Sequence, residues 1–373
     1  MGECMDNIQL FDFYSFIYFF LVYAITNITA FFGKKFLDLK NNTMMKIYKI
    51  GISIPFSIFA GLRNENVGYD THNYILNYIN FDRISSNILI DGYPFNYLYY
   101  IIIKGTFILT DINVNAFLFI MAFITMYVIA SAYEIDKNNY SVWGILLFMF
   151  YLAPRMLDQA RQFMALGFFA LALLESYKLH QARCVLFMII GGLIHETVLI
   201  FIPVYFAAKI LRGKIKYTFI ISVMILLGCF FDTLFSIILQ YLPEHYLYIE
   251  LQQKINGSVD GWFWVLDILP LIVSLIYFYK MGKGSGNVDF IELVAWSAIP
   301  FRLLAYYSFF VMRMYYYGAM AGILLACISW AHDTKNTDAF KISVICIYML
   351  FWMFEVFLFN MNGVIPYEWC IYD

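Results

Sequence analysis

The chain has 373 residues and a formal net charge of −2, with 62% hydrophobic and only 13% charged residues. Soluble domains carry about 25% charged residues, so this composition excludes an ordinary soluble protein and predicts a polytopic membrane protein. The sequence has no basic stripe and no nucleotide-binding or metalloprotease motif, so we expect no nucleic acid partner.

Membrane-length apolar runs recur along the whole chain. The first of them, residues 13–32, is free of charge and long enough to cross a hydrocarbon core of about 30 Å. We expect one all-α integral membrane domain over residues 1–373, with about 11–12 transmembrane or re-entrant helices. The predicted runs are 13–32, 47–62, 94–110, 112–132, 141–153, 162–177, 184–208, 217–239, 262–279, 290–311, 314–331 and 342–360.

Positive charge orients these runs. The loop 33–49 contains five lysines and one aspartate, and the loop 209–216 is basic without an acidic residue, so both loops should be cytoplasmic. Counting outward from them places the N-terminus, the loop at about 63–92 and the C-terminal tail outside. The loop at about 63–92 is the one long enough to fold over a site.

Residues 93–208 allow two arrangements. If all five runs cross, Arg155 and Arg161 lie inside, whereas Lys178 and Arg183 lie outside, against the positive-inside rule. The alternative, which we favour, makes one short run non-spanning. It turns 184–208 into a re-entrant hairpin that breaks near Gly191-Gly192, with His195 close to its tip.

Cations accompany the apolar runs in unusual number. A cation near hydrocarbon costs several kcal/mol, so it persists where it faces a partner, a wet cavity or an anionic ligand. Few carboxylates lie nearby, which suggests that an anionic substrate supplies the missing negative charge. The residues concerned are Arg63, Arg155, Arg161, Arg183, Arg302, Arg313 and His195.

The first group follows the second run. Gly68 permits a tight turn at the membrane surface, and Asp70 and Thr71 are suited to cap a helix that begins near Asn73. Arg63, at the end of the run, is explained equally well by snorkelling to the interface or by phosphate binding.

The second group opens the run 162–177. Arg155, Asp158 and Arg161 recur at helical spacing, so one helix face can hold two guanidiniums around a carboxylate. An internal Arg–Asp–Arg bridge explains this pattern. One carboxylate does not neutralise two arginines, however, and the remaining charge is available to a ligand.

Two further groups lie deeper in the sequence. His195 is followed by Glu196 in an otherwise uncharged run, and it is either a packing residue or a proton acceptor with an unperturbed pKa of about 6.5. Arg302 and Arg313 are separated by close to three helical turns and can share a face. Arg313 is also explained as an interfacial anchor beside an aromatic belt.

In this order, these residues resemble the EpsG/Wzy-type polysaccharide polymerases of bacterial surface-glycan assembly. The resemblance runs the length of the chain, although each motif is short. The matching pieces are Gly61-Leu62-Arg63, residues 67–74, Arg161-Gln162 with Ala165, His195 after Gly191-Gly192, Arg313 with Tyr316 and Tyr317, and Ile365-Pro366-Tyr367.

The resemblance implies a GT-C-like membrane glycosyltransferase that acts at the outer face of the bacterial cytoplasmic membrane. Its donor and acceptor would be glycans linked to undecaprenyl diphosphate in the lipid bilayer, and its partner a chain-length regulator. Arginines in a water-poor site would stabilise the departing diphosphate, and a base would take the acceptor proton. We expect no cofactor and no obligatory metal.

These roles fall on eleven residues. We assign diphosphate binding to Arg63, Arg161 and Arg313, assisted by Arg155 and Arg302. His195 is the leading candidate for the base, and Asp70 is the alternative. Four tyrosines are candidates for glycan binding. The diphosphate and glycan residues are Arg63, Arg161, Arg313, Arg155 and Arg302, and Tyr69, Tyr74, Tyr316 and Tyr317.

Three other functions remain open. An O-antigen ligase uses the same donor, and only the motif set separates it from a polymerase. A flippase for the lipid-linked unit would need cations in both halves of its path, whereas Arg63 and Arg313 are expected at the outer face. A membrane O-acyltransferase is disfavoured, because the long loop after Arg63 suits a bulky glycan better.

Overall fold

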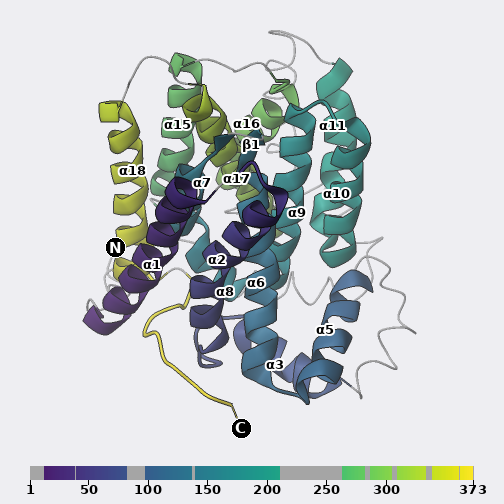
Figure 1. The fold of residues 1–373 in the computed structure, drawn as a ribbon, viewed down its shortest axis with the longest axis vertical. Coiled ribbons are helices and arrows are strands. Elements are labelled where there is room, and N and C mark those ends of the chain that lie inside the picture. The colour runs from purple at the N-terminus through teal and green to yellow at the C-terminus, as the bar shows by residue number, and fades with distance from the viewer. Residues whose placement is uncertain are drawn as a thin grey trace.

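The computed structural model describes residues 12–37, 39–81, 97–136, 139–210, 263–281, 286–304, 309–332, 338–360 and 362–372. These residues form a bundle in which the longer helices stand side by side (Figure 1). The α-helices are α1 (Phe13–Phe36), α2 (Asn42–Gly61), α3 (Thr71–Ile79), α5 (Tyr97–Thr110), α6 (Val114–Ala132), α7 (Val142–Tyr151), α8 (Ala153–Asp158), α9 (Ala160–Tyr177), α10 (Gln181–Ile194), α11 (Phe201–Ile210), α15 (Phe263–Met281), α16 (Asp289–Leu304), α17 (Phe309–Ala331) and α18 (Asp338–Trp352). A 3₁₀ helix η2 (Glu196–Ile200), a π-helix η3 (Met353–Leu358) and two short antiparallel strands, β1 (Glu134–Asp136) and β2 (Asn139–Tyr140), complete the described elements.

The predicted all-α architecture is confirmed over these residues. The described residues of each predicted run are mainly helical, and the run 217–239 lies outside the described ranges. Four helices in the described part of the chain are long and apolar enough to cross a membrane: Phe13–Phe36, Val114–Ala132, Met312–Ala331 and Asp338–Leu358. Three further apolar helices in the described ranges have only 10–17 residues, namely Tyr97–Thr110, Val142–Tyr151 and Gln181–Ile194, so length and composition alone do not establish a dozen crossings.

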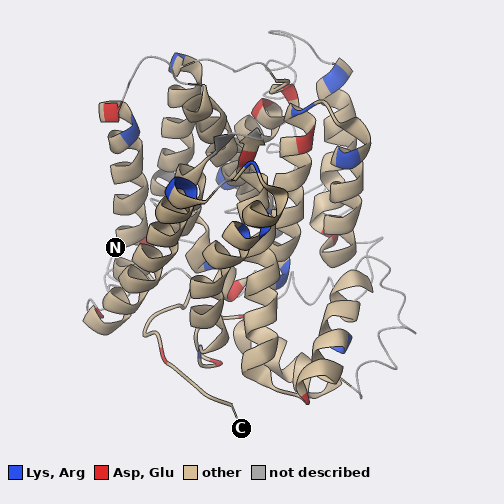
Figure 2. Cartoon of the chain, in the orientation of Figure 1, with Lys and Arg blue, Asp and Glu red and all other residues tan. Residues whose placement is uncertain are grey.

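The two ends of the bundle hold different segments of the chain. Helix α3, the start of α1 and the C-terminal tail lie at the lower end of Figure 1. Lys and Arg mark the upper ends of α11, α15 and α18 in Figure 2. The loop after α2 and the tail, both predicted to be outside, thus share one end of the molecule. The basic end of α11, predicted to be cytoplasmic, lies at the other.

The predicted break in run 184–208 is present, but it falls at His195 rather than at the two glycines. Helix α10 continues through Gly191 and Gly192 to Ile194 and ends at His195, whose backbone is extended. The chain then turns back, and η2 packs against the last turns of α10. A Cβ on Gly192 would lie 2.2 Å from Leu199, so the missing side chain admits the returning segment.

A contact at the C-terminal end of α9 and the length of α5 favour the arrangement with a hairpin. Lys178, just after α9, donates to the carbonyl of Glu134, whose carboxylate pairs with Lys49 at 2.6 Å. Lys178 therefore lies at the end of the bundle where α2 begins. Helix α5 has only 14 residues, about 21 Å, which is too short to cross a core of about 30 Å.

The C-terminal tail fastens the end of α2. The backbone N–H of Cys370 donates to the carbonyl of Leu62, and that of Asn64 donates to Glu368. The ring of Tyr367 stacks on Phe59 with 4.0 Å between centroids. Two sequence motifs that are about 300 residues apart, Gly61-Leu62-Arg63 and Ile365-Pro366-Tyr367, are thus neighbours in space.

Candidate active site

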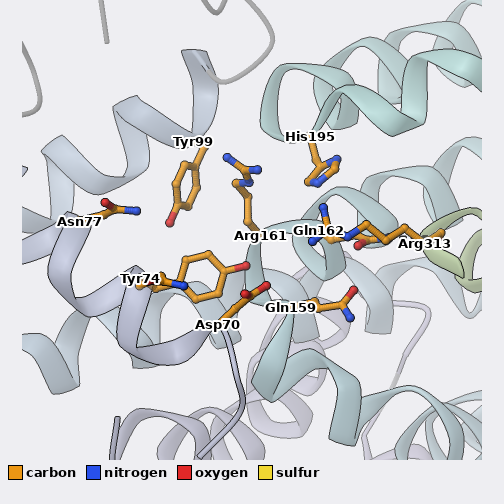
Figure 3. A pocket seen from close by; sticks show the side chains of 10 residues that line it. Asp70, Tyr74, Asn77, Tyr99, Gln159, Arg161, Gln162, His195 and Arg313 are labelled. Carbon is orange, nitrogen blue, oxygen red and sulfur yellow. Dashed lines mark hydrogen bonds between the residues drawn. The ribbon is translucent and has the colours of Figure 1, made fainter. Parts of the chain in front are cut away.

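A cavity of about 160 Å³ lies where α3, α5, α9, the end of α10 and α17 converge. Figure 3 shows that its charged and polar side chains converge from different segments of the chain. The cavity is lined by Asp70, Asn73, Tyr74, Asn77, Tyr99, Gln159, Arg161, Gln162, His195 and Arg313. Five of these residues, namely Asp70, Tyr74, Arg161, His195 and Arg313, are among the predicted site residues.

Asp70 is placed by the turn that precedes α3. Gly68 has a φ of +90°, and a Cβ there would lie 2.9 Å from the backbone of Asp158 and Leu157. The turn can therefore press closely against the end of α8 only because position 68 has no side chain. The backbone N–H of Asp70 donates to Oδ1 of Asp158 at 2.9 Å, which fixes the position of Asp70.

The structure corrects the capping role expected for Asp70. Helix α3 begins at Thr71, and Asp70 occupies the N-cap position, but its side chain makes no capping hydrogen bond. The carboxylate lines the cavity instead. Its presence there has no explanation in helix formation, which strengthens the case that it faces a ligand.

Arg161 and Gln162 are placed by a break between α8 and α9. Gln159 leaves helical geometry, with φ −106° and ψ 52°, so α9 starts anew at Ala160 and its first turn faces the cavity. The Arg161 guanidinium lies 5.5 Å from the centroid of the Tyr99 ring on α5. This cation–π contact holds the cation beside an aromatic wall.

Arg313 reaches the cavity from α17. The side-chain amide of Gln162 donates to the backbone carbonyl of Arg313 at 3.1 Å, which ties α9 to α17 at this level. Figure 3 shows the Arg313 side chain extending toward Gln162, with His195 above them and Arg161 alongside. Two guanidiniums from helices about 150 residues apart therefore meet in one cavity.

His195 lines the same cavity from the tip of the α10 hairpin. It is 3% exposed, and its Nδ1 lies 2.9 Å from Oγ1 of Thr197. The Thr197 hydroxyl in turn lies 2.7 Å from that of Tyr317 on α17. The imidazole is therefore held on one side by a buried chain of hydroxyl groups.

The lining residues carry more positive than negative charge. Arg161 and Arg313 are two cations, and Asp70 is the one carboxylate among the residues that line the cavity. Burial raises the pKa of the Asp70 carboxyl above its ordinary value, and the neighbouring Arg313 and Arg161 partly offset this shift. The cavity therefore combines an excess of guanidinium charge with a carboxyl group suited to accept a proton.

Most of the chain matches a known protein family. Residues 46–369, most of the chain, match the EpsG family. The chain belongs to the EpsG family. EpsG is a polysaccharide polymerase-type family of membrane proteins. The matched region contains every residue that lines the cavity. No curated protein and no solved structure matches the chain.

Not every predicted diphosphate residue of this EpsG-family chain lines the cavity. Arg63 is 2% exposed and lies outside the lining set. Its Nη1 donates to the carbonyl of Ala60 at 2.7 Å and its Nε to Oγ1 of Thr71 at 3.3 Å. Arg63 therefore braces the segment that carries Asp70, and the structure gives it no contact with the cavity.

Arg155 and Arg302 also take other partners. Arg155 donates to Asp267 and to Glu355, and Nε of Arg302 donates to the second oxygen of Asp267 at 2.5 Å. All four side chains are at most 4% exposed, and two cations face two carboxylates. An Arg–Asp–Arg bridge thus exists, but it joins Arg155 and Arg302 through Asp267 rather than Arg155 and Arg161 through Asp158. We do not propose diphosphate binding for these two arginines.

The predicted tyrosines separate in the same way. Tyr74 lines the cavity, whereas Tyr69 is 69% exposed and lies against the tail at Gly363. Tyr316 and Tyr317 are buried, the first beside Arg155 and the second against Thr197. Only Tyr74 of the four is therefore placed to touch a ligand in this cavity.

Five lining residues were not among the predicted site residues, although one of them, Gln162, belongs to the Arg161-Gln162 motif. Asn73 and Asn77 follow Asp70 on α3 and are one helical turn apart, so a polar stripe after an acidic N-cap was the available signal. Gln159 lies at a helix break that no pattern in the sequence predicts. Tyr99 lies in a run of aromatic residues that also fits a membrane interface, and nothing local distinguishes it.

The described residues offer no evident metal centre. Within the described ranges, no three histidine, cysteine or acidic side chains come together in a way that could hold a metal ion.

Proposed function

We propose that this chain is a glycosyltransferase of GT-C-like architecture that polymerises undecaprenyl-diphosphate-linked repeat units into surface polysaccharide. The observation that carries the proposal is the convergence of Arg161, Arg313, His195 and Asp70 in one cavity. Membership of the EpsG family supports it independently. Asp70, in the turn between α2 and α3, lines the cavity, and the loop after α2 is predicted to be outside, so we propose that the reaction takes place at the outer face of the cytoplasmic membrane.

The cationic side of the cavity suits a leaving diphosphate. Transfer breaks the bond between the anomeric carbon of the donor and its phosphate oxygen, so negative charge grows on that oxygen. Guanidiniums form strong, paired hydrogen bonds with phosphate. Arg161 and Arg313, which are anchored through Tyr99 and Gln162, are therefore already in position to stabilise this charge in the transition state.

The carboxyl group of Asp70 suits the acceptor. The attacking hydroxyl of the acceptor glycan must lose its proton as the new glycosidic bond forms. A carboxyl group whose pKa is raised by burial is a better proton acceptor than an exposed aspartate. His195 is the other group in the cavity that can exchange a proton.

The side of the cavity formed by α3 and α5 suits the sugar. Asn73 and Asn77 present amides, which both donate and accept hydrogen bonds, and Tyr74 and Tyr99 present aromatic rings. This mixture matches sugar hydroxyls and sugar faces, whereas the opposite wall carries the guanidiniums. A cavity of about 160 Å³ is small beside binding sites of roughly 300–1,000 Å³, so it would take only the reacting end of the glycan.

The partners of the reaction follow from this proposal. Donor and acceptor would both be lipid-linked glycans that reach the cavity from the bilayer, and a chain-length regulator would act with the polymerase. We propose no cofactor. Addition of EDTA should leave turnover unchanged, and loss of turnover that a divalent cation restores would contradict a metal-free reaction.

Purified protein and a deletion strain together test the proposal. Purified protein mixed with lipid-linked repeat units should form a ladder of longer lipid-linked glycans, and the R161A variant should not. In the deletion strain, polymer should disappear while single repeats still reach the surface. Transfer of single repeats to another lipid acceptor would identify a ligase instead, and accumulation of unflipped units would identify a flippase.

A further inference from the structure

The hydrogen bonds of His195 determine which of its two nitrogens faces the cavity. His195 separates α10 from η2 and occupies the N-cap position of η2. Its Nδ1 accepts a long hydrogen bond of 3.5 Å from the backbone N–H of Thr197 and lies 2.9 Å from the Thr197 hydroxyl. Because Nδ1 is engaged with Thr197, Nε2 is the nitrogen available to a ligand in the cavity.

A backbone N–H can only donate a hydrogen bond. The Nδ1 atom that receives it must therefore present its lone pair, and a neutral imidazole then carries its single proton on Nε2. The hydroxyl chain fits this tautomer from end to end. With Nδ1 as an acceptor, the Thr197 hydroxyl can donate to it across 2.9 Å, which leaves Oγ1 of Thr197 to accept from the Tyr317 hydroxyl across 2.7 Å.

The opposite tautomer conflicts with this surrounding. A proton on Nδ1 would place two donors against each other, because the backbone N–H of Thr197 is also directed at Nδ1, and only the Thr197 hydroxyl would be left to accept from it. His195, Thr197 and Tyr317 are all at most 3% exposed, so the conflict would not be relieved by water from outside. A general base needs a lone pair on the nitrogen that faces the substrate, and here that nitrogen carries the proton.

We propose that His195 acts through Nε2–H as a neutral hydrogen-bond donor to the departing phosphate oxygen, and that Thr197 and Tyr317 are the positioning residues that hold this tautomer. This inference rests on the function proposed above. As the acceptor oxygen bonds to the anomeric carbon, the bond from that carbon to the phosphate oxygen breaks and the diphosphate leaves with the electron pair. The acceptor proton passes to the carboxylate of Asp70.

Replacing His195 by glutamine separates a donor from a base. The glutamine amide can donate a hydrogen bond from nearly the position of Nε2, but it cannot take up a proton. We expect H195Q to retain activity within about tenfold of the wild type and H195A to lose about 10²–10³-fold, the typical effect of removing one such donor. D70N, which removes the base, should be inactive even though H195Q is not.

The contrary result is equally clear. If H195Q is as inactive as H195A while both are present in the membrane at wild-type levels, His195 is a base and the inference fails. The matched control is His180→Gln, because His180 is half exposed and pairs with Glu175 far from the cavity. It should leave turnover unchanged.

A measurement on the tautomer itself covers the case in which H195Q does not fold. In ¹⁵N-histidine-labelled wild-type protein, His195 should give the signals of a protonated Nε2 and a bare Nδ1. T197V keeps the backbone N–H but removes the hydroxyl, and Y317F removes the end of the chain, so either should shift these signals. A bare Nε2 in the wild type overturns the inference.

The tautomer measurement also distinguishes the two proposals, since it needs no turnover. The predicted tautomer in a protein that makes no polymer would remove the proposed function and leave the hydrogen-bond assignment intact. Polymer formation by a protein whose Nε2 carries no proton would support the proposed function and overturn the hydrogen-bond assignment.

Discussion

Oδ1 of Asp158 accepts a hydrogen bond of 2.9 Å from the backbone N–H of Asp70. The two residues are 88 positions apart, and the bond joins the end of α8 to the turn that starts α3. Asp158 thus positions Asp70 through the backbone and leaves the Asp70 carboxylate to the cavity. The bond connects the segment that carries the proposed base to the break that presents Arg161.

Removing this bond should impair catalysis more than it impairs binding. We expect D158A to lower kcat by about a hundredfold, because a displacement of about 1 Å in a reacting group costs that much. D158N keeps an oxygen acceptor and should retain most of the activity. Steady-state kinetics with lipid-linked repeat units measure the difference, and equal losses in D158A and D158N would show that the charge of Asp158 matters instead.

The two cavity arginines should be sensitive to the shape of their side chain as well as to its charge. R161A and R313A should each lower turnover by about 10²–10³-fold. R161K and R313K should lose on the order of tenfold, because lysine keeps the charge but not the paired hydrogen bonds. R183A is the control, since Arg183 is 67% exposed and faces Glu175. Full activity in both lysine variants would exclude a bidentate clamp.

Two glycines should respond in opposite directions. G68A should destabilise the protein by about 1–2 kcal/mol or more, because position 68 has a φ of +90° and a Cβ would strike the backbone of Asp158. G105A lies within helix α5 with nothing within 4 Å of the new Cβ, and it should stabilise by about 0.4–1 kcal/mol. Thermal unfolding of purified protein reports both effects, and polymer formation should fail only in G68A.

The buried cluster of Arg155, Arg302, Asp267 and Glu355 should act on stability rather than on chemistry. R155A leaves two carboxylates buried with one guanidinium between them, and the cost of breaking such a pair is about 3–5 kcal/mol. The amount of intact protein in membranes should fall steeply. K341A, at an exposed pair, should not change it. An R155A protein that is stable but inactive would assign Arg155 to the reaction after all.

Activity should depend on pH through Asp70. The base must be deprotonated, and burial raises its pKa, so activity should be present at high pH and lost as the pH falls through this raised value. The loss should begin at a higher pH than for an exposed aspartate. Neutralising the guanidinium that lowers this pKa, as in R313Q, should move the midpoint further upward. A midpoint that does not move would mean that another group controls the profile.

The sequence by itself determined the class of protein and where its apolar helices lie along the chain. Apolar runs, basic loops and short motifs are local properties, and they correctly predicted helices, the turn at Gly68 and the interruption of run 184–208; five of the residues that they singled out line one cavity. These features can be predicted because helix length, hydrophobicity and turn chemistry depend on neighbours along the chain.

Tertiary structure alone decided which arginines face the cavity. Arg155 pairs with Asp267 and Glu355, which are 112 and 200 positions away, and no local pattern indicates such partners. Arg161, only six residues later, lies in the cavity because the helix breaks at Gln159 and restarts with a different face inward. Whether a buried cation is neutralised within the fold or left facing a ligand depends on side chains brought together by packing. A linear sequence does not encode that pairing in any one segment.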